Sequence, residues 1–128
     1  MKKKVLIIQA NYYKDISTAL LKSAKNELKN FAKINVISVT GVFDIPVVIS
    51  KNLKKYDGFV ALGCVIKGQT PHFDFISKST TDAIMNISVD SKKPVGNGII
   101  TCLNKNQAIA RGKKGREAAN AVKTILSL

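Results

Sequence analysis

The stretch that decides the fold runs from residue 56 to residue 77 and reads YDGFVALGCVIKGQTPHFDFIS. Its first half contains the apolar run 59–66, which has the length and composition of a buried strand. A turn with Gly68 follows, and then come Pro71 and His72, the only histidine in the chain. In open α/β sheets, ligands bind beyond the carboxyl ends of the strands. We therefore expect this strand to deliver a functional polar turn.

Outward from this stretch, apolar runs alternate with segments that have helical spacing. Strands are expected at 5–10, 34–39, 59–66 and 94–101, with helices after each strand and one more through Ala118 to Leu126. Short apolar strands that alternate with helices are typical of a parallel sheet covered on both faces. The sequence therefore predicts one α/β domain over residues 1–128.

The spacing of apolar residues also predicts which side of each helix is buried. Asp15 is placed to cap the first helix. The buried face of that helix is expected to comprise Ile16, Leu20, Ala24, Leu28 and Phe31. The second helix begins around Pro46, a residue suited to a first helical turn, and its apolar face is expected to comprise Val47, Val48 and Leu53.

Glycines mark two further features. Gly96 and Gly98 lie inside the fourth strand, where glycine indicates a bulge or the close approach of another group. The segment RGKKGR, residues 111–116, is expected to form a cationic turn before the last helix. The helix dipole would favour an anion at that point, although a simple solvated junction is an equal alternative.

The composition restricts the class of protein. A hydrophobic fraction of 45% indicates a globular chain, and no apolar run reaches the roughly 18 residues that a membrane helix needs. The start MKKKVLII has the charge of a signal peptide but too short an apolar part, so we expect a cytoplasmic protein. Cys64 and Cys102 lie in apolar runs and are expected to be buried reduced thiols, ahead of a disulfide or a metal site.

The formal net charge is +13, which favours anionic partners such as nucleic acid, acidic membranes or phosphorylated metabolites. However, of the 21 basic residues only Arg111 and Arg116 are arginine, and specific base recognition prefers arginine. The lysines are scattered along the chain. A lysine-rich solvated surface is therefore the favoured interpretation, with no nucleic-acid and no membrane partner.

The loops that follow the strands meet at one edge of a parallel sheet, and here they contain tyrosines, a phenylalanine, a carboxylate, lysines and His72. This set suits a heterocyclic ligand that carries an anion. A lone histidine is more often structural, but its position after a strand end favours proton transfer near neutral pH. The turn at Gly68 is suited to a phosphate, although such turns are as often structural. With one histidine and no Cys/His cluster, no metal site is expected.

Several motifs together resemble the 6,7-dimethyl-8-ribityllumazine synthase family over nearly the whole chain. The most specific match is ALGCVIKGQTPHFDFIS at 61–77. The others are NYYKDI at 11–16, GVFDIP at 41–46, PVGNGIITCLNKNQAIAR at 94–111 and KGREAANA at 114–121. The order of these motifs along the chain is also that of the family.

The resemblance implies a flavodoxin-like three-layer α/β/α sandwich with a four-stranded parallel sheet. It implies condensation of 5-amino-6-(ribitylamino)uracil with 3,4-dihydroxy-2-butanone 4-phosphate, with release of phosphate and water and with no metal or organic cofactor. It also implies a homo-oligomer, a pentamer with active sites between neighbouring subunits. Some members of the family assemble such pentamers into hollow capsids.

The resemblance further assigns roles to single residues. On the heterocycle side, Tyr12 would stack on the pyrimidine ring, Val42, Phe43 and Asp44 would hold the ribityl chain, and Val65 and Ile66 would offer backbone groups. On the phosphate side, the turn would comprise Gly68, Gln69 and Thr70, with His72 as the proton-transfer residue, Arg111 as the phosphate ligand and Lys114 facing the substrate.

This chain also departs from the family pattern. Asn97 stands where many members carry a phenylalanine that packs on the neighbour's ligand, and Asp44 is one methylene shorter than the usual glutamate. The loop between Arg111 and Lys114 is shorter than in the family. This loop motivates an alternative function, a non-catalytic flavin- or lumazine-binding shell protein with the same fold.

Overall fold

A computed structural model describes residues 2–128. Five α-helices, one short 3-10 helix (η1) and four strands are present in that part of the chain. In order they are β1 (Lys3–Ala10), α1 (Lys14–Leu28), β2 (Ala32–Val39), η1 (Val42–Asp44), α2 (Ile45–Lys51), β3 (Gly58–Ile66), α3 (His72–Ser91), β4 (Val95–Cys102), α4 (Lys105–Ala110) and α5 (Lys114–Leu126). The alternation that the apolar runs predict is therefore confirmed.

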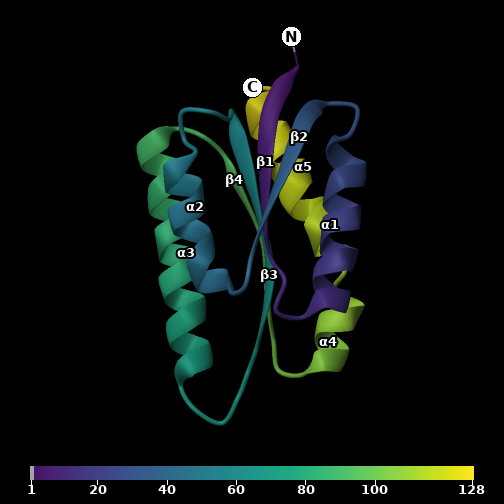
Figure 1. The fold of residues 1–128 in the computed structure, drawn as a ribbon, viewed down its shortest axis with the longest axis vertical. Helices are drawn as coiled ribbons and strands as arrows, with labels where there is room; N and C mark the ends of the chain where they lie inside the picture. The colour runs from purple at the N-terminus through teal and green to yellow at the C-terminus, as the bar shows by residue number, and fades with distance from the viewer. Residues whose placement is uncertain (1) are drawn as a thin grey trace.

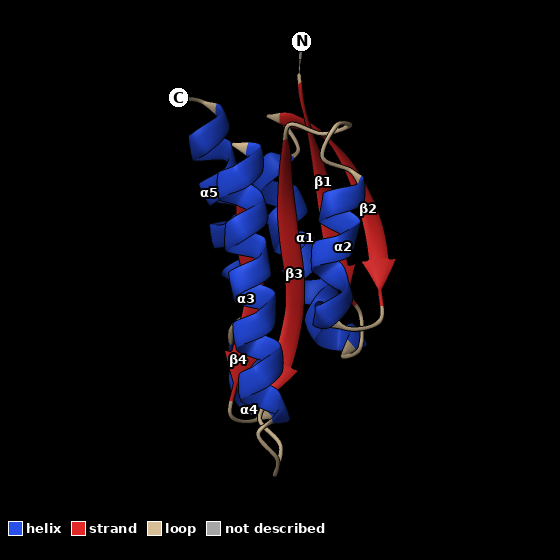
Figure 2. Ribbon diagram, turned by 90° about the vertical axis from the view of Figure 1, so that its left-hand side faces the viewer, coloured by secondary structure: helices blue, strands red, loops and turns tan. Residues whose placement is uncertain are grey.

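The strands form one parallel sheet with the order β2-β1-β3-β4. Helices α1 and α5 cover one face and helices α2 and α3 cover the other, so the molecule has three layers (Figures 1 and 2). The sequence of β1 is continuously apolar because the side chains from Val5 to Ile8 are fully buried between the two helical layers. The flavodoxin-like α/β/α sandwich is thereby confirmed.

The sheet order places a crevice at the carboxyl ends of β1 and β3. The chain leaves β1 towards β2 on one side and leaves β3 towards β4 on the other, so the connections diverge between these two central strands. Such a divergence point opens a crevice outside the sheet. The long loop after β3 and the loop after β1 therefore stand at the two sides of this crevice.

The structure of α1 corrects two local predictions. Asp15 does not cap α1, because the N-cap position is Tyr13 and Asp15 lies in the first turn. Phe31 lies beyond the end of α1 and packs only partly buried against the core, whereas Ile16, Leu20, Ala24 and Leu28 are buried as expected.

In α2 the buried residues are Ile45 and Ile49, while Val47 is exposed. Val48 and Leu53 pack at the margin of the same core. The helix begins at Ile45, and positions four apart lie on the same side, so the pair Ile45 and Ile49 faces the sheet. Pro46 does occupy the first turn, as predicted.

The turn predicted over 111–116 covers only residues 111–113, because α5 begins at Lys114. Gly115 is buried where α5 crosses α1, and a Cβ there would lie 2.6 Å from Ser23 Oγ and would also overlap the Leu20 carbonyl oxygen. This glycine therefore serves close helix packing, and it does not break the helix.

Candidate active site

A cavity of about 350 Å³ lies at the carboxyl ends of β1 and β3, in the crevice described above. It gathers six of the residues that the sequence singled out, from four separate segments of the chain. They are Tyr12, Val42, Phe43, Val65, Ile66 and His72. The wall also includes Ala10, Tyr13, Gly41, Cys64 and Ile76, which sequence reasoning did not select.

Two aromatic rings at this cavity are largely free. Tyr12 is 70% exposed and Phe43 is 63% exposed, which is unusual for large rings that have a core available to them. Val42 is buried, and its side chain packs against Gly63 of β3, where a Cβ would lie only 2.5 Å from Val42 Cγ1. The cavity therefore has a rigid apolar floor and exposed rings at its margin.

Tyr13 fixes the position of Tyr12. The two rings pack edge to face with centroids 4.9 Å apart and planes at 81°. The Tyr13 carbonyl accepts hydrogen bonds from the Ser17 amide at 2.9 Å and from Ser17 Oγ at 2.8 Å, which ties the loop to α1. Burial raises the pKa of the Tyr13 phenol, and Cys64 and Tyr12 add to the shift, so the ring stays neutral. In the sequence, the only indication that Tyr13 belongs to the cavity was its position next to Tyr12.

His72 is the first residue of α3 and is exposed at the cavity. Its backbone amide donates to Thr70 Oγ1 at 3.4 Å. Among the hydrogen bonds of residues 2–128, none uses the amides of Gly68, Gln69 or Thr70. These N–H groups precede the N-terminus of a long helix, and both features favour an anion at this turn.

Asp44 lies beside the cavity and not in its wall. Its carboxylate Oδ2 accepts a hydrogen bond from the Gly41 amide at 3.3 Å and so closes the short helix η1. This bond leaves the second carboxylate oxygen free to face solvent at the same edge of the sheet.

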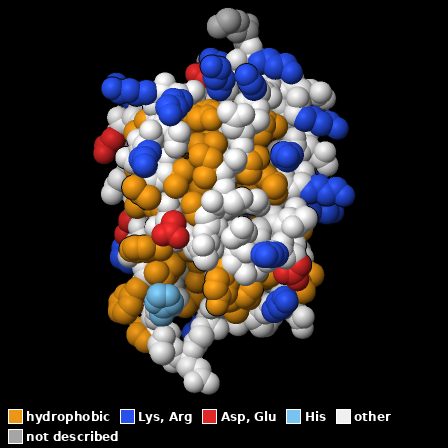
Figure 3. Space-filling view, in the orientation of Figure 1, with side chains coloured by type: hydrophobic (Ala, Val, Ile, Leu, Met, Phe, Trp, Pro, Cys, Tyr) orange, Lys and Arg blue, Asp and Glu red, His pale blue; other side chains and the backbone are white. Residues whose placement is uncertain are grey.

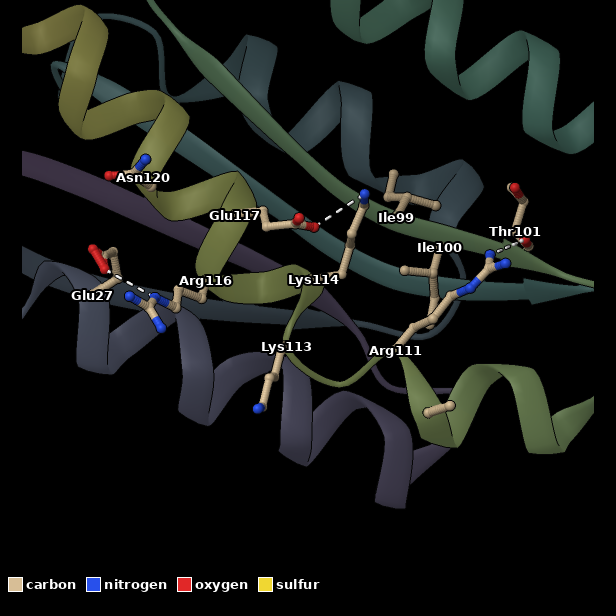
Figure 4. Close-up of a pocket in the computed structure, with 11 residues that line it drawn as sticks. Glu27, Ile99, Ile100, Thr101, Arg111, Lys113, Lys114, Arg116, Glu117 and Asn120 are labelled. Atoms are coloured by element: carbon tan, nitrogen blue, oxygen red, sulfur yellow. Dashed lines mark hydrogen bonds and ion pairs between the residues drawn. The ribbon is translucent and has the colours of Figure 1, made fainter.

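A second and larger cavity of about 950 Å³ contains the cations (Figure 4). Arg111 and Lys114 both line it, so the short loop between them does bring the two side chains to one place. Arg111 Nη1 donates to the Thr101 carbonyl at 3.1 Å, and Lys114 pairs with Glu117 at 3.0 Å. Arg111 Nη1 also lies 3.9 Å from Cys102 Sγ, so the guanidinium is held at the carboxyl end of β4.

The two cavities reach neighbouring strands of the sheet. Val65 in the first cavity is paired in register with Thr101 in the second. No lysine or arginine lines the first cavity, while the second cavity opens at β4, an edge strand of the sheet. Asn97 is exposed on the same edge strand, and its Oδ1 accepts from the Ile99 amide at 3.0 Å. Within one chain the aromatic residues and the cationic residues thus line two different cavities.

Cys64 and Cys102 are both buried and free, as predicted. Burial raises the pKa of the Cys64 thiol to about 12, and the nearby Cys102 adds to the shift. Among residues 2–128 there is no group of three or more His, Cys, Asp or Glu side chains placed to hold a metal ion. No helix within that range is long and apolar enough to span a membrane.

The raised pKa of Cys64 gives a pH-dependent prediction. The folded protein holds this proton more tightly than the unfolded chain, so the stabilisation is complete below about pH 9 and is lost as the pH rises towards 12. Between about pH 9 and 11, the unfolding free energy of the wild type should fall more steeply than that of Cys64→Ala, by up to about 1.4 kcal/mol per pH unit. Urea unfolding at a series of pH values measures this difference, since lysine titration is common to both proteins. Parallel profiles would contradict it.

Comparison with known proteins identifies relatives along the whole chain. The family model described as 6,7-dimethyl-8-ribityllumazine synthase matches residues 2–128. The protein of that name from Agrobacterium fabrum is 42% identical, over 97% of this chain and 93% of the relative. The one from Bartonella tribocorum is 42% identical, over 100% and 92%. The one from Corynebacterium kroppenstedtii is 39% identical, over 90% and 77%.

Proposed function

The chain belongs to the 6,7-dimethyl-8-ribityllumazine synthase family, and from that premise we propose which of its residues carry out the family's reaction. The reaction condenses 5-amino-6-(D-ribitylamino)uracil with 3,4-dihydroxy-2-butanone 4-phosphate to 6,7-dimethyl-8-ribityllumazine, releasing phosphate and water. It belongs to riboflavin biosynthesis, and the enzyme is a transferase. We assign it to a single domain over residues 1–128. The single observation that carries the assignment of roles is the cavity that joins Tyr12, Phe43 and His72.

The aromatic cavity takes the pyrimidine. Tyr12 stacks on the ring from its packed position on Tyr13, and the backbone of Val65 and Ile66 at the end of β3 binds the edge of the ring. The ribityl chain then lies along η1, where Val42 and Phe43 contact it and the free oxygen of Asp44 accepts from its hydroxyls. A cavity lined mainly by apolar groups with a few polar groups suits a flat heterocycle of this kind.

The butanone phosphate binds at the turn after β3. The free amides of Gly68, Gln69 and Thr70 hold the phosphate at the N-terminus of α3. Arg111 completes the phosphate site and Lys114 faces the substrate, while Asn97 lies at the same junction. When the amine of the pyrimidine attacks the ketone, an imine forms with loss of one water, phosphate leaves, and the ring closes with loss of a second water.

His72 moves protons between these steps. Its imidazole stands at the margin of the cavity, between the ring site and the phosphate turn. Formation of the imine and closure of the ring each require a proton to be taken from nitrogen and given to oxygen, and imidazole is suited to this exchange near neutral pH. Much of the remaining rate comes from holding two substrates in one place.

The arrangement of the two cavities supports an active site shared between subunits. Arg111 is held at the carboxyl end of the edge strand β4 and does not line its own chain's Tyr12 cavity. The aromatic cavity itself has no cation. We therefore assign Arg111 and Lys114 to the neighbouring subunit's phosphate site, so that each subunit gives one half of each active site.

Exposed apolar side chains support a pentamer. Five large hydrophobic residues on η1, α2 and α3 are more than half exposed, namely Phe43, Val47, Phe75, Met85 and Val89. Hydrophobic side chains reach the surface over this layer in Figure 3. Exposed apolar side chains on one layer favour an interface between subunits, and a closed ring would cover them. The free, buried thiols of Cys64 and Cys102 support a cytoplasmic location.

Mixing two impaired variants tests the shared site. His72→Ala and Arg111→Gln are each expected to have little activity, because each lacks one half of the site. Unfolded together and refolded at equal amounts, they should recover about one quarter of wild-type lumazine formation, because each half is intact at a given junction with a probability of about one half.

The control is to mix the two proteins without unfolding, which should leave activity low while subunits do not exchange. A mixture of Arg111→Gln with Lys114→Gln, which damage the same half, should also recover nothing. If the co-refolded His72 and Arg111 variants stayed inactive while eluting as assembled rings, the site would lie within one subunit. Wild-type protein that binds lumazine without forming it would instead identify the non-catalytic shell protein, which the names of the relatives do not favour.

A further inference from the structure

Lysines are concentrated at the amino edge of the sheet, opposite the candidate active site. Because all strands are parallel, the turns after the helices meet at this edge. Lys4 and Lys33 begin β1 and β2, Lys54 and Lys55 follow α2, and the pair at 92 and 93 follows α3. Figure 3 shows Lys and Arg side chains grouped at the end from which the N-terminus emerges. The scattered lysines of the sequence are therefore brought together in space.

Part of this edge is hollow. A cavity of about 390 Å³ lies between the starts of β1 and β2 and the turn after α2. Its lining consists of Lys4, Lys33, Asn35, Lys54, Lys55 and Tyr56. The cavity thus has four ammonium groups and no carboxylate in its wall. The cationic cavity beside Arg111 is different, because Glu27 and Glu117 line it and pair with its cations.

The four lysines of this cavity form no intramolecular ion pair. The ion pairs among residues 2–128 involve none of their side chains. The carboxylate next to them in the chain is Asp57, and its Oδ2 accepts from the backbone amide of Lys4 at 2.8 Å. That carboxylate is therefore used to fix the loop to β1.

The register of the sheet forces two of the lysines together. Lys4 and Lys33 are direct partners on adjacent parallel strands, so their side chains leave the sheet on the same face. Like charges in opposite positions of a sheet destabilise it. A ligand with several negative charges would remove this repulsion.

The polar residues of the cavity are also arranged for an anion. Asn35 Nδ2 donates to the Tyr56 hydroxyl oxygen at 2.7 Å, so the phenolic proton is free to donate outwards. The Tyr56 ring is fixed by an edge-to-face contact with Phe59, with centroids 6.0 Å apart. Lys93 Nζ donates to the Leu53 carbonyl and to the Tyr56 carbonyl at 2.9 Å, which holds the turn in place. The hydroxyl donor is thus held in place, and the four lysines are exposed and unpaired.

We propose that this cavity binds a condensed phosphate chain, a di- or triphosphate group, at a site separate from the lumazine site. Lysine presents point charges with rotatable donors, which suits clustered phosphate oxygens without a fixed planar geometry. A single phosphate engages only part of the cavity, whereas a chain of phosphates contacts all four ammonium groups together. A nucleic-acid strand is less suited, because single-strand sites need an extended groove with exposed aromatic rings.

Tripolyphosphate is the probe that tests the site, by isothermal titration at about 0.15 M salt, where long-range screening is strong. Binding to Lys33→Gln/Lys55→Gln should be weaker than to the wild type by about tenfold or more. The double variant Lys25→Gln/Lys78→Gln removes the same charge away from the cavity and should bind within about twofold of the wild type. Orthophosphate should bind the cavity at least about tenfold more weakly than tripolyphosphate.

Further measurements separate the alternatives. Arg111→Gln should keep tripolyphosphate binding, and loss of binding in that variant would assign the anion to the Arg111 cavity and overturn the proposal. Equal weakening in both double variants would reduce the effect to net charge and also overturn it. Tighter binding of an oligouridylate with the same number of charges would identify a nucleic-acid surface instead. ATP is a second probe. If ATP and tripolyphosphate bind with equal affinity, the cavity recognises the phosphate chain alone and not the nucleoside. Lumazine formation in Lys33→Gln/Lys55→Gln should stay at the wild-type rate.

Discussion

Replacement of His72 by alanine is expected to lower kcat for lumazine formation about 100-fold, with KM for either substrate changed by less than about threefold. The imidazole lines the aromatic cavity but belongs neither to its apolar floor nor to the phosphate turn. Its loss therefore removes proton transfer and leaves most of the binding contacts in place. Steady-state kinetics that follow formation of the lumazine chromophore measure both constants.

Two further measurements make this prediction specific. Added imidazole should restore part of the turnover of His72→Ala, because the vacated space at an exposed helix start is open to solvent. Asp74→Asn changes a neighbouring polar side chain in the same first turn of α3, one that does not line the cavity, and should leave kcat within about twofold. If His72→Ala raised KM and left kcat unchanged, His72 would be a binding residue.

The strands were predictable from sequence because both faces of the sheet are covered. Under two helical layers, β1 and β3 must be apolar along most of their length, and this produces runs that stand out without any periodicity. Their ends were less predictable. Lys3 and Lys4 continue the pairing of β1 with β2, but exposed lysines give no apolar signal.

Two helix predictions failed, at Gly115 and in α2. Gly115 was assigned to a turn, yet it lies within α5 and permits the close crossing of α5 over α1. In α2 the predicted face contained Val47 and Val48, whereas the buried residues are Ile45 and Ile49, because Ile45 is already the first residue of the helix. The spacing of apolar residues in α2 showed that the helix has an apolar face, but it did not determine which residues form that face.

The candidate site was predicted as one set of residues, and the structure divides it. Tyr12, Phe43 and His72 meet because their loops all follow parallel strands at the same edge. Arg111 also follows a strand, but α4 intervenes, and its guanidinium contacts the end of β4 and lines a different cavity. The sequence pattern of one chain carries no information about which of these two cavities a side chain lines, so this division came from the fold.

Gly96→Ala is expected to lower the free energy of unfolding by about 3 kcal/mol or more, the second large effect that the structure predicts. A Cβ at this position would overlap the carbonyl oxygen of Ala118 and would lie 2.8 Å from its carbonyl carbon and 3.0 Å from Val122 Cγ2. The obstacle is the backbone of a helix and not the end of a flexible side chain. Helix α5 must therefore move away from the sheet as a unit. Urea unfolding of the purified variant measures the loss.

The matched control is Gly68→Ala, where an added Cβ meets no atom within 4 Å and the backbone is not left-handed. Because alanine restricts the unfolded chain, that variant should be unchanged or more stable by about 0.4–1 kcal/mol. The interpretation of Gly96 as a point of close approach, and not a bulge, agrees with the uninterrupted pairing of β4 with β3. If the two variants were equally stable, α5 would not pack on β4 at this distance, and the shape of the cavity that Lys114 lines between α5 and β4 would be wrong.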